Sequence, residues 1–188
     1  MEVDEVSVVR SRGAVTLDEF TLGHKLGSGG MAKVYLAKTA DGREFALKVF
    51  KWDNKDFDRE SFVQVQNEYH QSAQLSNEHV VKFYGFRAES MLNKLNKCYK
   101  VSYIIQELIS GGELFDYIDD HGYFERHVVR YLISQILKGV LFLHSNGLAH
   151  RDLKTSNILF DANFNIKIVD LGLAKRIQGD AGDGLLNS

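Results

Sequence analysis

Apolar and polar residues alternate in short runs from residue 20 onward, at 20–26, 33–38, 43–50 and 101–106. A period of two over four to eight residues predicts β-strands with one buried face. The glycine-rich stretch 27–32 and the dipeptide Asp41-Gly42 separate the first three runs, and both are typical of hairpin turns. Residues 1–16 show no such period, and the polar stretch 88–100 predicts a solvated connection between strands.

Two longer segments follow a period near 3.6 residues, which predicts amphipathic helices. The first covers 57–75, and the second, over 125–144, is the longest periodic pattern in the chain. The second segment places six apolar residues on one stripe: Val129, Leu132, Ile133, Ile136, Val140 and Leu143. We interpret this stripe as hydrophobic core rather than as a functional site. A further helix is expected to begin near Gly111-Gly112-Glu113.

Two short apolar runs near the end of the chain, 158–160 and 166–169, are separated by a turn-forming stretch and predict a small hairpin. A hairpin brings its two ends together, so we expect Asn157 and Asp170 to face the same space. An amide oxygen and a carboxylate at one edge suit a hard divalent cation such as Mg²⁺, which keeps waters and substrate phosphates in its other positions.

Asp152 and Lys154 lie just before this hairpin. A carboxylate there can accept a proton from a hydroxyl, and an ammonium group can meet the charge on a transferring phosphoryl group. The segment therefore favours a nucleotide site. The alternative is that His150, Arg151 and Asp152 form only a salt-bridge cluster on the surface.

The glycine-rich turn at 27–32 has a predicted strand on each side, and glycine lets the backbone N–H groups approach phosphates closely. Such turns also occur without a ligand. Lys48, on the third predicted strand, is by itself consistent with a solvated charge, so its meaning depends on a partner.

The composition is that of an ordinary globular protein, with 188 residues, 44% of them hydrophobic and 26% charged, and a formal net charge of −2. This charge gives no indication of nucleic-acid or membrane binding, and no apolar run approaches the roughly 20 residues of a membrane helix. The single cysteine, Cys98, excludes an intramolecular disulfide framework. The acidic N-terminus is unlike a signal peptide, so we expect a cytoplasmic or nuclear protein.

The stretch His150-Arg151-Asp152-Leu153-Lys154-Thr155-Ser156-Asn157, followed by Asp170-Leu171-Gly172, resembles the catalytic and metal-binding loops of eukaryotic protein kinases. Ala46-Leu47-Lys48 and the turn at 27–32 resemble the Ala-x-Lys motif and glycine-rich loop of that family. Lys154, two residues after Asp152, matches the serine/threonine type. Gly111-Gly112-Glu113-Leu114-Phe115 is similar to the calcium/calmodulin-dependent and AMP-activated kinases.

The resemblance implies an α+β fold of the bilobal protein-kinase type. Its N-lobe would be an antiparallel five-stranded sheet with one helix, helix C, and its helical C-lobe would be incomplete. The implied divisions are a lead-in at 1–19, the N-lobe at 20–107 with its fourth strand at 80–84, a partial C-lobe at 108–178, and the start of a disordered activation loop at 179–188. In the family, further helices cover the apolar face that we expect at 128–143.

The resemblance also implies roles for individual residues. Asp152 would be the catalytic base, Lys154 would meet the phosphoryl group, and Glu68 would position Lys48 on the α- and β-phosphates of ATP. Asn157 and Asp170 would hold Mg²⁺. Contacts with ATP are implied for Leu26, Gly27, Ser28, Gly29, Val34, Ala46, Lys48, Gln106, Glu107, Ile109, Glu113 and Leu159. Among these, Gln106 would be the gatekeeper, and the backbone near Glu107 and Ile109 would bind the adenine edge.

The chain departs from the family pattern at several positions. Ala32 stands where the third glycine of the loop is expected, and Leu171 replaces phenylalanine in Asp-Phe-Gly. Ser72 occupies a position where the family has a large apolar residue in a spine between the lobes. Ser156 removes a carboxylate that could bind a second substrate arginine. The chain also has no proline.

Two hypotheses follow. The first is an ATP-dependent protein serine/threonine kinase, which transfers the γ-phosphoryl group of Mg-ATP to a hydroxyl of a protein substrate that carries an upstream basic residue. Glu113 would meet that basic residue, although a carboxylate at a helix start is also favoured by the helix dipole alone. The alternative is a truncated, non-catalytic kinase-like module that binds nucleotide or a partner protein.

Overall fold

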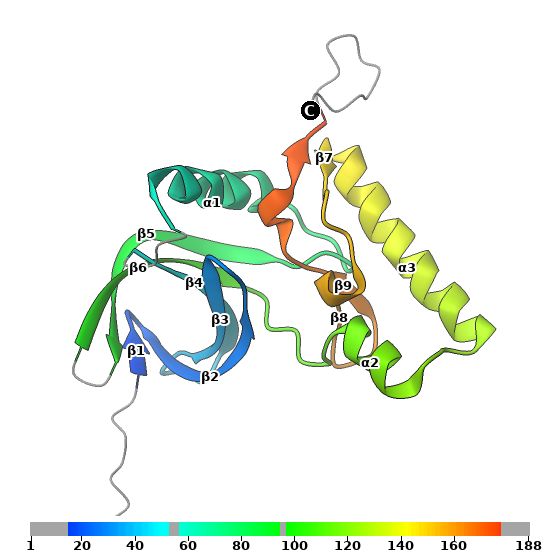
Figure 1. Ribbon diagram of the computed structural model, residues 1–188, viewed down its shortest axis with the longest axis horizontal. Helices are drawn as coiled ribbons and strands as arrows, with labels where there is room; N and C mark the ends of the chain where they lie inside the picture. The colour runs from blue at the N-terminus through cyan, green and yellow to red at the C-terminus, as the bar shows by residue number, and fades with distance from the viewer. Residues whose placement is uncertain (1–14, 53–56, 95–96, 178–188) are drawn as a thin grey trace, which may run out of the picture.

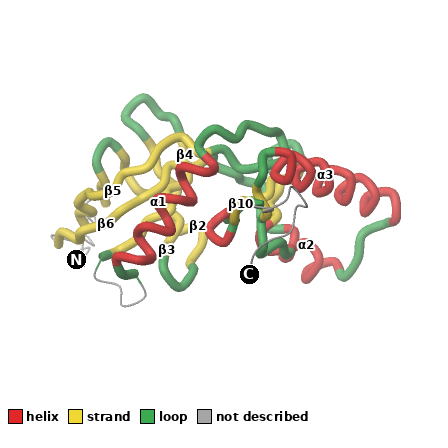
Figure 2. Tube along the Cα trace, turned by 90° about the horizontal axis from the view of Figure 1, so that it is seen from above, coloured by secondary structure: helices red, strands yellow, loops and turns green. Residues whose placement is uncertain are grey.

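The computed structural model describes residues 15–52, 57–94 and 97–177, which form two lobes joined by one extended segment (Figure 1). The first lobe contains a β-sheet and helix α1. The second contains α2, α3 and short two-stranded sheets. The strands of the first lobe and the helices α2 and α3 lie at opposite ends of the molecule, as Figure 2 shows.

Six strands build the first lobe: β1 (Val15–Leu17), β2 (Phe20–Ser28), β3 (Ala32–Lys38), β4 (Glu44–Lys51), β5 (Phe83–Lys94) and β6 (Lys97–Gln106). Neighbours pair antiparallel in the order β1-β2-β3-β4-β6-β5, and β1 also pairs with β5, which closes the sheet into a barrel. Inward residues such as Leu47, Val101 and Tyr103 are fully buried and form the core of this barrel.

Two expectations for this lobe are wrong. The sheet has six strands rather than five, because β1 lies in the segment expected to be a lead-in at 1–19. Three residues are too few to show a period of two, and β1 pairs with distant residues of β5, Leu92 and Asn93. The turn after β1 is tied to β6, since the Tyr103 hydroxyl donates to Asp18 at 2.6 Å.

Residues 88–100 also differ from the expected polar connection, because β5 continues to Lys94 and β6 begins at Lys97. Over this stretch β5 buries only Leu92 fully, and its neighbours on either side are exposed. Such a mostly solvated ribbon carries little apolar signal in its sequence.

Helix α1 (Arg59–Ser72) begins where its sequence provides a cap. The Asp58 side chain accepts a hydrogen bond from the Ser61 N–H at 2.9 Å, which satisfies one free donor of the first turn. Phe57 and Phe62 lie on either side of the cap, and both rings pack on Trp52, with centroid separations of 5.5 and 5.2 Å. These contacts hold the helix against the sheet.

The second lobe consists of short elements around one long helix. They are α2 (Leu114–His121), α3 (Arg126–Ser145), β7 (Leu148–Ala149), η1 (Thr155–Asn157), β8 (Ile158–Phe160), β9 (Ile166–Ile168), η2 (Leu171–Leu173) and β10 (Lys175–Arg176). β8 and β9 form the predicted hairpin, and β10 pairs with β7. The activation-loop start expected at 179–188 lies outside the described residues.

The inner face of α3 differs in part from the predicted stripe. Leu132 and Leu143 are buried as expected, but Val129 and Ile133 are 41% and 48% exposed. The buried face instead includes Gln135 and Gly139. Gln135 accepts a hydrogen bond from the Ile166 N–H at 2.8 Å, and a Cβ on Gly139 would lie 2.8 Å from Ile168 Cδ1. The inner face of α3 is therefore the one that allows close approach to β9. The pattern of hydrophobic residues alone does not predict which face this is.

No helix within the described part of the chain combines the length and apolar character needed to cross a bilayer.

Candidate active site

A cavity of about 380 Å³ lies between the two lobes. All the residues predicted to contact ATP line it, from the glycine-rich turn, strands β3, β4 and β6, the connecting segment and β8. Asn157, Asp170 and Lys154 line it as well. It also contains four residues that were not predicted as contacts: Ala32, Val81, Ser156 and Val169. Val81 and Val169 lie in apolar runs of the sequence, and nothing local distinguishes them from core residues.

Lys48 lies between two carboxylates at one side of this cavity. Its Nζ is 3.2 Å from Glu68 Oε1 and 2.7 Å from Asp170 Oδ1. Lys48 lies on β4 and Glu68 on α1, while Asp170 follows β9 in the other lobe. The three side chains therefore join the sheet, the helix and the second lobe at one point.

The ammonium group of Lys48 sets the ionisation of both carboxylates. Burial by itself would lower the pKa of Lys48, but the charges of Glu68 and Asp170 outweigh it and hold that pKa above its usual value. Burial raises the pKa of Glu68, and Lys48 offsets this only in part. Burial also opposes ionisation of Asp170, yet the closer Lys48 prevails and lowers the pKa of Asp170. The close ammonium group therefore favours the ionised form of Asp170.

The backbone around Asp170 is held in an uncommon conformation. Asp170 has φ 59° and ψ 69°, in the left-handed region, and leads into η2. Leu171 is buried in the same apolar cluster as Val65 of α1, which fixes the segment after the bend. A Cβ on Gly172 would lie 3.3 Å from both Asp170 Oδ1 and Glu68 Oε2, so a side chain there would crowd the two carboxylates.

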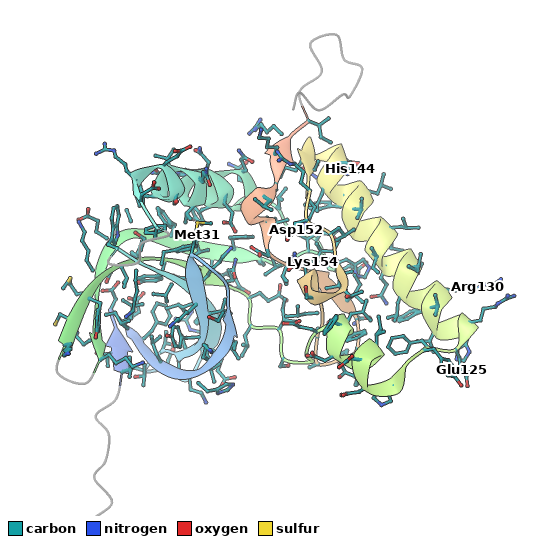
Figure 3. All side chains as sticks on the ribbon, viewed as in Figure 1. Met31, Glu125, Arg130, His144, Asp152 and Lys154 are labelled. Carbon is teal, nitrogen blue, oxygen red and sulfur yellow. The ribbon has the colours of Figure 1, made fainter. Side chains whose placement is uncertain are left out.

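Asp152 is the centre of a second polar network. Its Oδ2 accepts hydrogen bonds from Lys154 Nζ at 2.8 Å and from Asn157 Nδ2 at 3.0 Å. The bond from Lys154 and that from Asn157 together lower the pKa of Asp152, so its carboxylate is ionised at neutral pH. Figure 3 shows Asp152 and Lys154 in the middle of the molecule, between the barrel and α3.

His150 positions the loop that carries Asp152. Its Nδ1 accepts a hydrogen bond from the Asp152 N–H at 3.3 Å, and its Nε2 lies 2.9 Å from the Val169 carbonyl. A neutral imidazole with its proton on Nε2 satisfies both contacts. The buried ring thus links the loop to the residue before Asp170, which does not fit a surface salt-bridge cluster.

Asn157 and Asp170 lie at the same end of the β8–β9 hairpin, because the Val169 N–H donates to the Asn157 carbonyl at 3.0 Å. The Asn157 side chain uses its nitrogen to bond Asp152, and within the described part of the chain no hydrogen bond engages its amide oxygen, which can therefore serve as a ligand for a cation. An amide oxygen and an ionised carboxylate suit Mg²⁺. The residues present therefore fit the cation that the motifs imply.

The comparison with known proteins agrees with this geometry. Residues 20–184 match the family model described as the protein kinase domain.

The chain belongs to the protein kinase family. The CBL-interacting serine/threonine-protein kinase 1 of Arabidopsis thaliana is 33% identical over 95% of this chain and 38% of its own length. The CBL-interacting protein kinase 30 of Oryza sativa subsp. japonica is 36% identical over 93% of this chain and 35% of its length.

The SNF1-related protein kinase catalytic subunit alpha KIN12 of Arabidopsis thaliana is 36% identical over 84% of this chain and 30% of its own length. The chain thus spans about a third of the length of these curated relatives. The similarity to serine/threonine kinases of the AMP-activated group, predicted from the motifs, is confirmed.

The segment that joins the two kinase lobes is docked on β8. The Gly111 N–H donates to the Phe160 carbonyl at 2.7 Å, and the Phe160 N–H donates to the Gly112 carbonyl at 2.9 Å. A Cβ on Gly111 would lie 2.5 Å from the Phe160 oxygen, and Gly112 has φ 84°, so both positions require glycine. The pair of glycines therefore brings this hinge onto the floor of the cavity.

Ser72 is buried at 1% exposure, at the kinase position where a large apolar residue is usual. Among the described residues, no partner lies within hydrogen-bonding distance of its hydroxyl. A buried hydroxyl without a partner costs about 1–3 kcal/mol. Ser72 is therefore a weak point between α1 and the rest of the core.

We expect Ser72→Ala to raise the free energy of unfolding by about 1 kcal/mol, because the change removes an unpaired polar group and leaves only a small void. Urea unfolding would measure it. Ser102→Ala is the matched control, since Ser102 is also fully buried but bonds both Trp52 and the Ala88 carbonyl. That variant should be less stable than the parent. Loss of stability in both variants would show that the Ser72 hydroxyl is satisfied.

Proposed function

We propose that this protein is an ATP-dependent serine/threonine protein kinase, which transfers the γ-phosphoryl group of Mg-ATP to a hydroxyl of a protein substrate. One observation carries the proposal. Lys48 Nζ lies within 3.2 Å of Glu68 and 2.7 Å of Asp170, at the wall of a cavity that Lys154 and Asn157 also line. The cluster assembles phosphate-binding and cation-binding groups from both lobes in one place.

The base role falls to Asp152. Its carboxylate is ionised, and it can accept the proton of a serine or threonine hydroxyl as that oxygen attacks. Lys154, 2.8 Å from Asp152, carries a positive charge that can meet the phosphoryl group in transfer. The bonds from Lys154 and Asn157 orient the Asp152 carboxylate, so little reorganisation is needed when a substrate arrives.

Lys48 is suited to hold the α- and β-phosphates, and Glu68 to keep its ammonium in place. Gly27, Ser28 and Gly29 of the glycine-rich turn line the same cavity, and a Cβ on Gly27 would meet no atom within 4 Å, so there is room for phosphates to approach. Bound Mg²⁺, held by Asn157 and Asp170, would neutralise phosphate charge. At the other end of the cavity, backbone groups of Glu107 and Ile109 can hydrogen-bond an adenine edge.

The chemistry at the start of α2 supports a substrate with a basic residue. Glu113 lines the cavity, and burial together with the charge of Asp116 raises the pKa of Glu113. A guanidinium placed between these two carboxylates would relieve their repulsion. Ser156 lines the same region without a charge, so we expect selection for one basic residue rather than two.

Calorimetry of Mg-ATP binding to the 188-residue chain tests this function, with Lys48→Met as the comparison. We expect saturable binding to the parent chain and binding at least about tenfold weaker in Lys48→Met, because the substitution removes a charge-assisted contact to phosphate. Transfer of phosphate from ATP to a peptide with an arginine upstream of serine should follow. A folded parent chain that binds no Mg-ATP would contradict the proposal.

A further inference from the structure

One ion pair beneath the nucleotide cavity has no part in the chemistry described above. Lys167 Nζ lies 2.8 Å from Glu107 Oε1 and 3.0 Å from Glu107 Oε2, so both carboxylate oxygens face the ammonium group. The side chains are only 12% and 24% exposed for Lys167 and Glu107, respectively. A pair this shielded from water is screened little by salt, and removing one partner leaves a costly unpaired charge.

Glu107 belongs to the hinge and is tied there by its own backbone. Its N–H donates to the Lys82 carbonyl at 2.9 Å, and the Lys82 N–H donates back to the Glu107 carboxylate at 3.2 Å. The side chain therefore joins three segments, the entry to β5, the hinge and β9. Any shift of β9 relative to the hinge must stretch this carboxylate bridge.

Strand β9 is anchored at every one of its residues, each time by a different element. The Ile166 N–H donates to Gln135 of α3 at 2.8 Å. The Ile168 N–H donates to the His79 carbonyl at 2.8 Å, and the Ile168 carbonyl accepts from the Val81 N–H at 2.9 Å. Lys167, between them, holds the hinge. Only Val169 separates this strand from Asp170.

We propose that Glu107 and Lys167 are positioning residues for nucleotide binding, and that their ion pair sets the distance between the hinge backbone and Asp170. In the proposed function, on which this inference rests, the hinge backbone binds the adenine edge and Asp170 binds the phosphate end through Mg²⁺. A ligand that must meet both ends is sensitive to small displacements between them. The pair thereby couples recognition of the base to the position of the Asp170 carboxylate, the proposed metal ligand.

Calorimetry with Mg-ATP, and separately with adenosine, tests the proposal on Lys167→Met and Glu107→Gln. We expect each variant to bind Mg-ATP about tenfold more weakly than the parent, and the double variant to be no weaker than either single one, because the two residues act as a unit. Adenosine meets only the hinge end, so its affinity should fall less than that of Mg-ATP. Lys167→Arg, which keeps the charge, should restore most of the Mg-ATP affinity.

Lys38→Met is the matched control. It removes the lysine of another pair between neighbouring elements, Lys38–Glu44 at 2.6 Å, whose side chains are 56% and 42% exposed. This variant should bind Mg-ATP as the parent does. Melting temperatures are recorded for every variant, so that a general loss of stability is separated from an effect on binding.

Three results would overturn the inference. One is a lower melting temperature in Lys167→Met and Glu107→Gln with unchanged Mg-ATP affinity, which would make the pair purely structural. Another is tighter binding, which would mean that the pair restrains the hinge. The third is an equal loss for adenosine and Mg-ATP, which would confine the effect to the hinge. A parent chain that binds neither ligand would overturn the proposed function as well.

Discussion

Replacing Asp152 with asparagine is expected to lower the rate of phosphoryl transfer by about 10²–10⁴-fold, while the affinity for Mg-ATP stays close to that of the parent chain. The new side chain has nearly the same shape and can still accept the hydrogen bond from Asn157, so the loop should keep its conformation. It cannot take up the proton of an attacking hydroxyl. It also loses the ion pair with Lys154, now 2.8 Å long.

Single-turnover transfer to a serine peptide measures the chemical step, and calorimetry measures binding. Asp161→Asn is the control, because Asp161 accepts hydrogen bonds in a turn from the N–H groups of Asn163 and Asn165 and belongs to neither the Lys48 cluster nor the Asp152 network. It should transfer phosphate at the parent rate. If Asp152→Asn retained the parent rate while binding Mg-ATP normally, Asp152 would not be the base.

Replacing Asp170 with alanine is expected to abolish the part of ATP affinity that depends on Mg²⁺. In the parent chain, adding Mg²⁺ should tighten ATP binding, because Asp170 and Asn157 offer oxygen ligands beside the phosphate-binding Lys48. Mutation of residues that only hydrogen-bond the ligands of a metal commonly weakens metal affinity by about 10–100-fold. Loss of a direct ligand should weaken it by at least about that much. Calorimetry with and without Mg²⁺ gives the difference directly.

Adenosine is the control ligand for Asp170→Ala, because it carries no phosphate and should bind the variant and the parent equally. Removal of Asp170 also releases one contact of Lys48, which then has only Glu68. Lys48 therefore remains paired and need not disturb the fold. If Mg²⁺ still raised the ATP affinity of Asp170→Ala as much as it raises that of the parent chain, Asp170 would not be the metal ligand.

Much of the candidate site could be predicted because its motifs each lie within a short stretch of the sequence. His150 to Asn157 forms one loop, and Asn157 and Asp170 flank one hairpin, so their proximity follows from local chain geometry. Helix α1 lies within the segment 57–75, where the apolar period predicts a helix. Each of these features depends on residues within about one turn or one hairpin of each other.

Other features could not be predicted because they arise from contacts between distant segments. Strand β1 is too short to carry a pattern of its own and exists because β2 and β5 offer it backbone partners. The end of the β5–β6 ribbon, over 88–100, looks polar because most of its described side chains face water. On α3, Gln135 and Gly139 face inward because β9 needs a hydrogen-bond acceptor and room for close approach, neither of which is a hydrophobic signal.

The sequence by itself therefore determined the kind of protein, the order of most of its elements and which residues match the kinase motifs, because residue type and short spacing carry that information. Only the tertiary structure decided how the Lys48 ammonium is shared, 2.7 Å from Asp170 and 3.2 Å from Glu68, and hence in which direction the pKa of each carboxylate is shifted. It alone joined Glu107 to Lys167. The burial of these side chains and the distances between their charges control both arrangements, the sharing of the Lys48 ammonium and the Glu107–Lys167 pair. These burials and distances arise only when the two lobes come together.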